Sequence, residues 1–179
     1  SDHECSTFEN ALEKLRKGQF IMIREGTAAH NLKALMPLLT QQYYSRCMFA
    51  TDDKHPSDLL YGGHIDYIVK QALKNGADPI VALKTATHHA ARYFLLNNKG
   101  AIASGYLADI VVVDNLEDFN VETVFKRGKL VFDGEVKDFS APTVDEKLAE
   151  KCFDTFHLDS VTPSSFKVDG KLGLIGLVG

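Results

Sequence analysis

The sequence predicts an α/β fold in which strands of a parallel sheet are joined by crossover helices. Helical patterns alternate with short, apolar, β-branched runs through the first half of the 179 residues, an order that is typical of parallel sheets. Polar or acidic residues directly follow each of these runs. The fold is therefore a (β/α) barrel or a doubly wound sheet, and the lack of a glycine-rich phosphate loop weakens the doubly wound alternative.

The first helix is predicted to begin at Ser6, because residues 6–9 form a capping-box pattern in which a glutamate reaches back to the N-cap. Apolar residues then recur on one helical face, and Gly18 ends the helix. The apolar run at residues 19–23 predicts a buried strand, which is followed by a pair of charged residues.

A second helix and strand repeat this order. Residues 28–39 have apolar residues at helical spacing, and Pro37 should kink that helix or mark its last turn. The strand at residues 46–50 leads at once into Asp52 and Asp53. These acids either carry chemistry at the end of a strand or cap the turn that follows, and the residues alone leave both readings open.

Two further helical regions follow. A Gly-Gly pair precedes an amphipathic helix at residues 65–73, which Asn75 and Gly76 end. Asp78 then provides an N-cap with proline at the first helical position, and this helix runs to about Thr87, with a second one continuing beyond it.

From Gly100 onward, the helical patterns are replaced by strand-like segments. Four strand-like segments follow, and an Asp-Gly pair after the last of them signals a hairpin; the segments are residues 101–105, 108–114, 121–125 and 129–132. We expect a small antiparallel β unit here. Residues 139–145 are then predicted to be a linker, residues 146–153 a helix, and residues 172–178 the start of another β element.

Composition excludes several classes of protein. A net charge of −4 argues against a nucleic-acid partner, and no apolar run approaches the length of a membrane span. The three cysteines are odd in number and far apart, which favours reduced thiols in a cytoplasmic protein. The chain starts without methionine and stops after an apolar run, so we expect a fragment of a longer protein.

A resemblance to a known superfamily reduces the number of possible folds. Residues 99–114 (KGAIASGYLADIVVVD) resemble the signature of the amidohydrolase superfamily, at the point where its chains leave a (β/α)8 barrel for a small β domain. Residues 128–131 (GKLV) are similar to the next strand of that domain. The resemblance implies the C-terminal part of a metal-dependent (β/α)8, TIM-like barrel at residues 1–99 and a small β-sandwich unit at 100–138. A linker and the start of a further C-terminal domain would then occupy 139–179.

Four other motifs resemble the adenine deaminase family: SDHE at residues 1–4, IREGTAA at 23–29, TDDKHPSDLL at 51–60 and GHID at 63–66. This resemblance implies hydrolytic deamination of adenine to hypoxanthine and ammonia, in purine salvage, at a binuclear site of manganese or iron. The barrel would contribute its last three strands here, so the His-x-His pair and the other metal ligands of earlier strands are missing. We therefore expect the 179-residue chain alone to be inactive.

The resemblance also implies roles for individual residues. His3 and Asp52 match metal ligands, and Asp52 matches the carboxylate that shuttles the proton. Glu25 is assigned to catalysis, and the substrate-binding residues are predicted to be Arg24, Asp53 and His55.

Several residues near the predicted site could have a purely structural role instead. Arg24 and Glu25 could form an ion pair between the strand end and a loop, and Asp53 could cap a turn. Asp2 and Glu4 could be acceptors that orient the neighbouring imidazole, or solvated carboxylates.

Two other functions stay open. One is a different cyclic amidohydrolase, similar to dihydroorotase or imidazolonepropionase, although such enzymes tend to have other residues at the positions of Arg24–Gly26 and Asp53. The other is a non-catalytic barrel fragment that serves in folding or assembly. Because a fragment of a barrel exposes sheet edges, we also expect homo-oligomers. The expected small-molecule partner is adenine, with no nucleic acid and no membrane.

Overall fold

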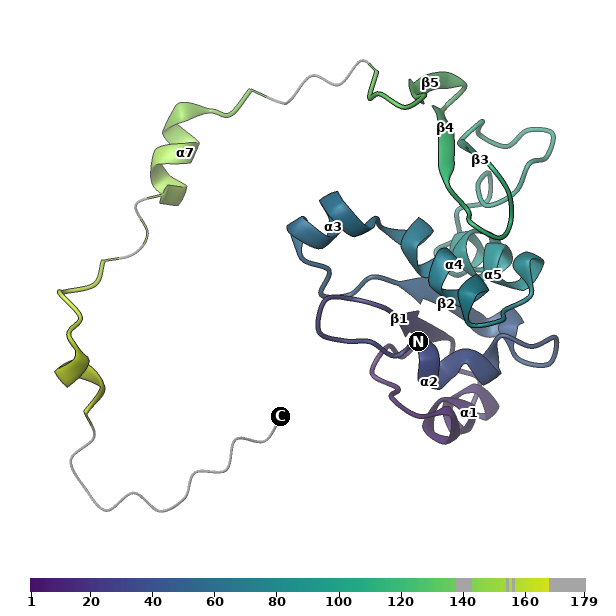
Figure 1. Cartoon of the computed structure of the whole chain (residues 1–179), viewed down its shortest axis with the longest axis horizontal. Helices are drawn as coiled ribbons and strands as arrows, with labels where there is room; N and C mark the ends of the chain where they lie inside the picture. The colour runs from purple at the N-terminus through teal and green to yellow at the C-terminus, as the bar shows by residue number, and fades with distance from the viewer. Residues whose placement is uncertain (138–142, 154, 156, 168–179) are drawn as a thin grey trace. The chain divides into compact units, whose positions relative to one another are not determined.

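The computed structural model describes residues 1–137, 143–153, 155 and 157–167. The chain divides into two compact units, Ser1–Phe139 and Ser140–Gly179. At the centre of the first unit, strands β1 (Ile21–Arg24) and β2 (Cys47–Ala50) pair in parallel (Figure 1). The predicted α/β class with parallel strands is therefore confirmed for this pair.

A third segment runs parallel to β1 on its other side. The amide of Asp2 donates to the carbonyl of Phe20 at 2.9 Å, and the amide of Met22 donates to the carbonyl of Asp2 at 2.9 Å. Since the three segments run in one direction, the residues that follow them lie at the same edge of the sheet. Residues 3–4, 24–25 and 52–53 therefore lie at this edge.

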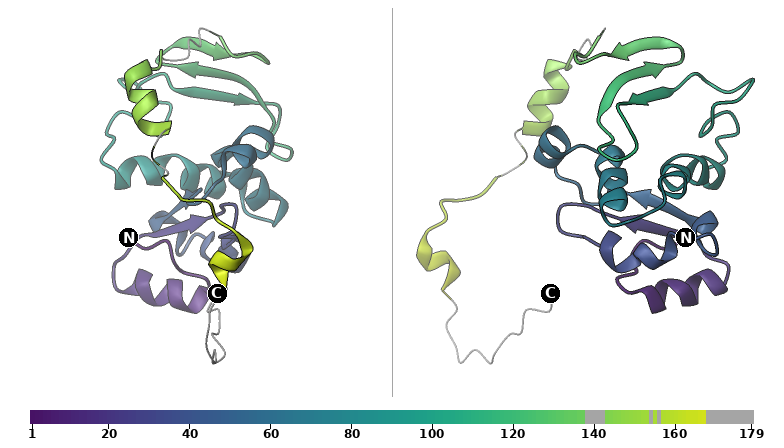
Figure 2. Two further views of the ribbon diagram at one scale, coloured as in Figure 1. Left: turned by 90° about the vertical axis from the view of Figure 1, so that its left-hand side faces the viewer. Right: turned by 45° about the vertical axis from the view of Figure 1, so that its right-hand side comes forward.

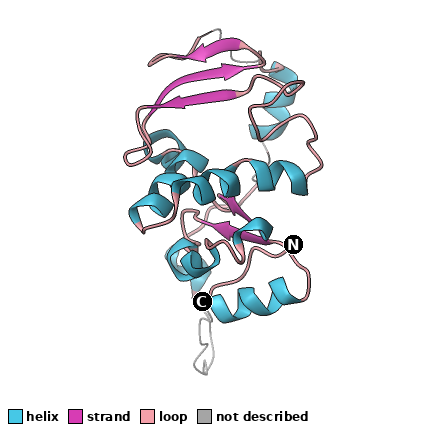
Figure 3. Cartoon of the chain, turned by 90° about the vertical axis from the view of Figure 1, so that its right-hand side faces the viewer, coloured by secondary structure: helices cyan, strands magenta, loops and turns pink. Residues whose placement is uncertain are grey.

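Helices accompany these strands along the first unit: α1 (Phe8–Arg16), α2 (Leu32–Leu35), α3 (Pro56–Gly62), α4 (Ile65–Lys74), α5 (Pro79–Ala86) and α6 (His88–Tyr93). Figure 3 shows them around the parallel strands. Helix α5 begins as predicted, since the carboxylate of Asp78 accepts from the amide of Val81 at 3.0 Å. Helix α3 was not predicted, although a proline in its first turn was an available signal.

The core lies between the parallel strands and the helices. Ile21 and Ile23 of β1 are fully buried, and they alternate with less buried neighbours, as a strand with one face on the core requires. Apolar residues of α2, α4 and α5 join them in a single cluster: Leu32, Leu35, Ile68, Val69, Ala72, Val81 and Ala82. Burying each large side chain contributes about 1.5–3 kcal/mol, so this cluster fixes the strands whose ends carry the polar residues.

Two local predictions in the first forty residues were wrong. The N-cap of α1 is Thr7 rather than Ser6, because the hydroxyl of Thr7 accepts from the amide of Asn10 at 3.3 Å. The helix predicted at residues 28–39 is only α2 followed by a 3-10 turn at Met36–Leu38. Its first residues form a loop instead, since side chains from elsewhere take up their backbone amides; Pro37 lies in the last turn, as predicted.

Residues 110–132 form the antiparallel β unit (Figure 2). Strands β3 (Ile110–Val113), β4 (Val121–Lys126) and β5 (Lys129–Phe132) pair in that order. Arg127 and Gly128 connect β4 to β5, both with positive φ (50° and 76°), which suits a tight two-residue hairpin. The strand predicted at residues 101–105 is wrong, because this segment is a loop with a turn.

A sandwich needs a second sheet facing the first. No such sheet is present among the residues that the structure describes, so the predicted β-sandwich stays a prediction. Where the β unit begins, the carboxylate of Asp109 accepts from the ammonium groups of Lys99 and Lys126 and from the amide of Arg127. One aspartate thereby joins three separate segments of the chain.

The second unit contains helix α7 (Glu146–Phe153), as predicted, and a 3-10 turn at Pro163–Phe166. The predicted linker at residues 139–145 lies partly outside the described residues, and the predicted β element at 172–178 lies wholly outside them. Across the described part of the chain, no helix combines the length and the apolar character that a bilayer span requires.

Candidate functional site

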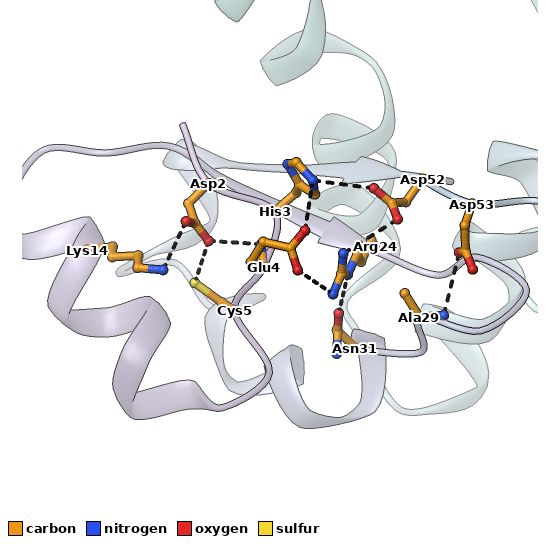
Figure 4. A network of polar contacts seen from close by, with 10 residues as sticks. All are labelled: Asp2, His3, Glu4, Cys5, Lys14, Arg24, Ala29, Asn31, Asp52 and Asp53. Carbon is orange, nitrogen blue, oxygen red and sulfur yellow. Dashed lines mark hydrogen bonds and ion pairs between the residues drawn. The ribbon is translucent and has the colours of Figure 1, made fainter. Parts of the chain in front are cut away.

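Four side chains from the three strand ends form a closed ring (Figure 4). His3 Nε2 lies 3.1 Å from Glu4 Oε1 and 3.5 Å from Asp52 Oδ1. On the other side of the ring, Arg24 Nη2 lies 2.8 Å from Glu4 Oε2, and Arg24 Nη1 lies 3.4 Å from Asp52 Oδ2. The fold thus brings together His3, Arg24 and Asp52 of the predicted site, and it adds Glu4.

The backbone of Asp52 has an unusual conformation. Its φ is +50°, in the left-handed region that few residues other than glycine adopt and that aspartate tolerates better than most. Residues in this region cluster at functional sites, where the surrounding structure maintains the strain. The turn directs the Asp52 carboxylate toward His3 and Arg24 immediately after β2 ends.

Glu25 lies on the same strand end but outside the ring. One of its carboxylate oxygens contacts His30 Nδ1 at 2.7 Å, and the other accepts from the amide of Leu32 at 3.2 Å. The hydrogen bond to Glu25 raises the pKa of His30. The side chain of Glu25 is only 12% exposed. Its contacts with His30 and Leu32 hold the loop before α2.

Asp53 and His55 also contact this loop rather than the ring. The amides of Ala28, at 2.9 Å, and Ala29, at 3.5 Å, donate to the Asp53 carboxylate and hold its pKa below the usual range. A Cβ on Gly26 would lie 1.8 Å from Asp53 Oδ1, so only glycine allows this approach. The amide of His55 donates to the Thr27 hydroxyl at 2.7 Å.

Asp2 does not orient His3, contrary to one of the sequence hypotheses. Its carboxylate contacts Lys14 Nζ at 2.9 Å and Cys5 Sγ at 3.1 Å, and it accepts from the amide of Glu4 at 3.0 Å. Lys14 and Cys5 lower the pKa of Asp2 to about 2. Asp2 therefore attaches the N-terminal segment to α1, while Glu4 contacts the imidazole of His3.

Imidazole and carboxylate groups suit the divalent metals that the sequence resemblance implies. His3 Nε2 and Asp52 Oδ1 are 3.5 Å apart, less than twice the usual metal–ligand distance of about 2.0–2.2 Å, so both could bind one ion. Within the described ranges, no group of three or more His, Cys, Asp or Glu side chains is arranged to hold a metal. The two predicted ligands fit a metal, but they do not complete its coordination.

Cavities occur at the opposite end of the strands. One of about 220 Å³ is lined by Phe20, Ser45, Arg46, His89 and Arg92, and a larger one of about 510 Å³ shares three of these residues. Their lining includes residues that precede β1 and β2, and none of the predicted site residues. Because enzymes with parallel barrels carry their chemistry at the carboxyl ends of the strands, we place the candidate site at the ring.

Sequence reasoning missed Glu4 as a partner of Arg24, and it missed Asn31. The Arg24 Nε donates to Asn31 Oδ1 at 2.6 Å. No local pattern marked Asn31, which lies in a region predicted to be helical. Glu4 did carry a signal, since it directly follows a predicted metal ligand.

Comparison with known proteins gives a consistent result. The sequence profile of the Amidohydrolase family matches residues 9–131. An adenine deaminase of Kosmotoga olearia is 48% identical over an alignment of 162 residues that covers 82% of this chain and 28% of that protein. An "adenine deaminase 2" of Carboxydothermus hydrogenoformans is 41% identical over 179 residues, which is all of this chain and 31% of that protein. The chain thus spans less than a third of the length of these relatives.

A solved structure shows a similar arrangement. The β-aspartyl dipeptidase of Fervidobacterium islandicum superposes with a TM-score of 0.61 and 27% sequence identity, over 74% of this chain and 36% of that one. The similarity in sequence to the deaminases is therefore higher than the similarity in sequence to this structural neighbour.

Proposed function

Because this chain belongs to the amidohydrolase family, we propose that the whole protein is a metal-dependent enzyme that hydrolyses adenine to hypoxanthine and ammonia. Relatives at 41–53% identity that are named adenine deaminases support this substrate. Within the chain, the observation that carries the proposal is the meeting of His3 and Asp52 at one strand edge.

The reaction needs a nucleophile at C6 of adenine and a group that moves protons. A divalent metal, when bound, lowers the pKa of a bound water toward about 7. His3 and Asp52 would hold the metal from this chain. The Asp52 carboxylate accepts a proton from the attacking water and delivers it to the departing amino group, so that a C–O bond forms and the C6–N bond breaks.

The remaining assignments belong to the same proposal. Two ions of manganese or iron would complete the site together with ligands from other parts of the enzyme. Residues 1–99 would be the last strands and helices of a (β/α)8 barrel, 100–138 a segment of the small β domain, and 139–179 a linker and the start of a further domain. Three neighbouring parallel segments support the barrel. A cytoplasmic homo-oligomer that binds no nucleic acid and no membrane completes this proposal.

Roles for the other predicted residues follow from their positions. Glu25 directly follows β1 at the edge of the site, and Asp53 and His55 lie in the loop after Asp52, where side chains can reach a bound purine. We retain Glu25 in catalysis and Asp53 and His55 in substrate binding as proposals.

The test uses the full-length enzyme loaded with Mn²⁺ and measures consumption of each substrate by chromatography, together with ammonia release from adenine. Adenine should be turned over, and dihydroorotate, imidazolonepropionate and β-aspartyl dipeptides should not. Turnover of one of those compounds with none on adenine would refute the proposed substrate. The 179-residue chain, assayed in parallel, should release no ammonia, because His3 and Asp52 are too few ligands to hold two metals.

A further inference from the structure

The guanidinium group of Arg24 is bonded to the protein on all sides, which a residue that contacts a substrate does not require. Its side chain is 15% exposed, although it closes a strand at the edge of the candidate site. Each of its three guanidinium nitrogens has a protein partner: Asn31 for Nε, Asp52 for Nη1 and Glu4 for Nη2. These partners come from three separate segments of the chain, so the guanidinium connects them.

In each of the two carboxylates of the ring, one oxygen contacts Arg24 and the other contacts His3. Glu4 contacts Arg24 through Oε2 and His3 through Oε1, and Asp52 contacts Arg24 through Oδ2 and His3 through Oδ1 (Figure 4). Because a carboxylate is planar, fixing one oxygen fixes the direction of the other. Arg24 therefore turns one oxygen of each acid toward the same imidazole nitrogen.

Charge favours the same arrangement. Two carboxylates that approach one imidazole repel each other, and a guanidinium between them offsets that repulsion. Arginine is suited to this task, since its planar group presents several donors in fixed directions, whereas lysine offers a single point of charge. Apart from His3 itself, no other described side chain makes an ion pair with both Glu4 and Asp52.

We propose that Arg24 is a positioning residue, which orients Asp52 and Glu4 around His3 for metal binding and does not contact adenine. This inference rests on the proposed function, because it takes His3 and Asp52 as the metal ligands. It replaces the substrate-binding role that the sequence resemblance implied for Arg24.

The direct test is Mn²⁺ affinity, measured by chelator competition on the metal-free full-length enzyme. Partners that orient metal ligands typically contribute about 10–100-fold to metal affinity, so Arg24→Gln should weaken Mn²⁺ binding by that factor. Arg46→Gln is the matched control: Arg46 lies before β2, donates to the carbonyl of Gly18 and pairs with no carboxylate in the described structure. It should leave Mn²⁺ affinity unchanged. Unchanged affinity in Arg24→Gln would overturn the proposal.

Steady-state kinetics with adenine give a second readout. A positioning role predicts that Arg24→Gln lowers kcat and leaves KM close to that of the wild type. A rise in KM with kcat retained would assign Arg24 to substrate binding instead.

Glu4→Gln covers the case in which Arg24→Gln does not fold. The Glu4 side chain is 63% exposed, so this exchange should not disturb the core, and it removes the charge that holds Nη2. Mn²⁺ affinity should fall in the same direction, and an unchanged value would contradict the proposal. Wild-type enzyme that binds Mn²⁺ but does not deaminate adenine would refute the proposed function, while the affinities would still decide the role of Arg24.

Discussion

Asp52 and Asp109 expose similar fractions of their side chains, 27% and 23%, and both face cationic groups. Their contacts nevertheless differ. Asp109 accepts from Lys99, from Lys126 at 3.0 Å and from the Arg127 amide at 2.9 Å, so both of its oxygens are fully engaged. The two contacts of Asp52 are long, at 3.4 and 3.5 Å, and its backbone is in the left-handed region.

This difference distinguishes a carboxylate that holds the fold from one that is open to a ligand. Short bonds to several segments stabilise a structure but leave no oxygen free for chemistry. Long contacts and a strained backbone are instead what a group needs if it is to bind a metal or exchange a proton. Exposure and net charge alone do not separate the two cases.

The largest expected effect concerns catalysis. In the full-length enzyme, Asp52→Asn should lower kcat for adenine by about 10²–10⁴-fold, the usual contribution of a proton-transferring group. Its thermal stability should change little, because only long contacts are lost. Asp109→Asn, assayed below its melting temperature, should retain kcat. If Asp109→Asn loses kcat as strongly as Asp52→Asn does, the contrast between the two acids is wrong.

Asp53 should also contribute to stability through its contacts with the amides of Ala28 and Ala29, although it is adjacent to Asp52. Gly26→Ala would place a Cβ against the Asp53 carboxylate and the Thr51 carbonyl, so we expect about 1–3 kcal/mol of destabilisation from overpacking. Urea unfolding of the full-length enzyme measures this. Gly62→Ala is the control, since its Cβ would meet nothing within 4 Å. Equal stability of the two variants would show that the loop does not depend on Asp53.

Asp109→Asn should lower the melting temperature of the full-length enzyme by several degrees, because Lys99 and the Lys126–Arg127 segment lose the charged carboxylate that they share. Asp133→Asn is a suitable control, since Asp133 is an exposed acid that contacts Lys137 at 2.8 Å and an exposed pair contributes little. Equal melting temperatures of the two variants would mean that Asp109 does not join the segments.

The smallest effect is on pH dependence. Lys99, the Arg127 amide and Lys126 hold the pKa of Asp109 well below its usual range. A lowered pKa in the folded state stabilises the fold above the unfolded pKa of about 3.9 and loses that contribution as the pH falls below it. The difference in melting temperature between wild type and Asp109→Asn should therefore be constant near neutral pH and shrink below about pH 4. A difference that grows on acidification would contradict this.

Local signals in the sequence predicted some features well. Asp78 with Pro79, Gly76 and the β-branched run at residues 110–113 carry their own backbone preferences, so their elements were found. Family resemblance supplied His3 and Asp52. The contacts of Arg24 with Glu4 and Asp52, and of Asp53 with Ala28, join side chains that are distant in the sequence. They depend on the parallel register, which no local pattern contains, and for the same reason residues 28–31 were predicted to be helical.

The most direct test of the account is the position of the metal in crystals of the full-length enzyme loaded with Mn²⁺, located by anomalous scattering. The account predicts an ion within about 2.0–2.2 Å of an imidazole nitrogen of His3 and an oxygen of Asp52. Arg24 should remain in contact with the other oxygen of Asp52. A bound ion that contacts neither His3 nor Asp52 would contradict the central claim that this strand edge is part of a metal site.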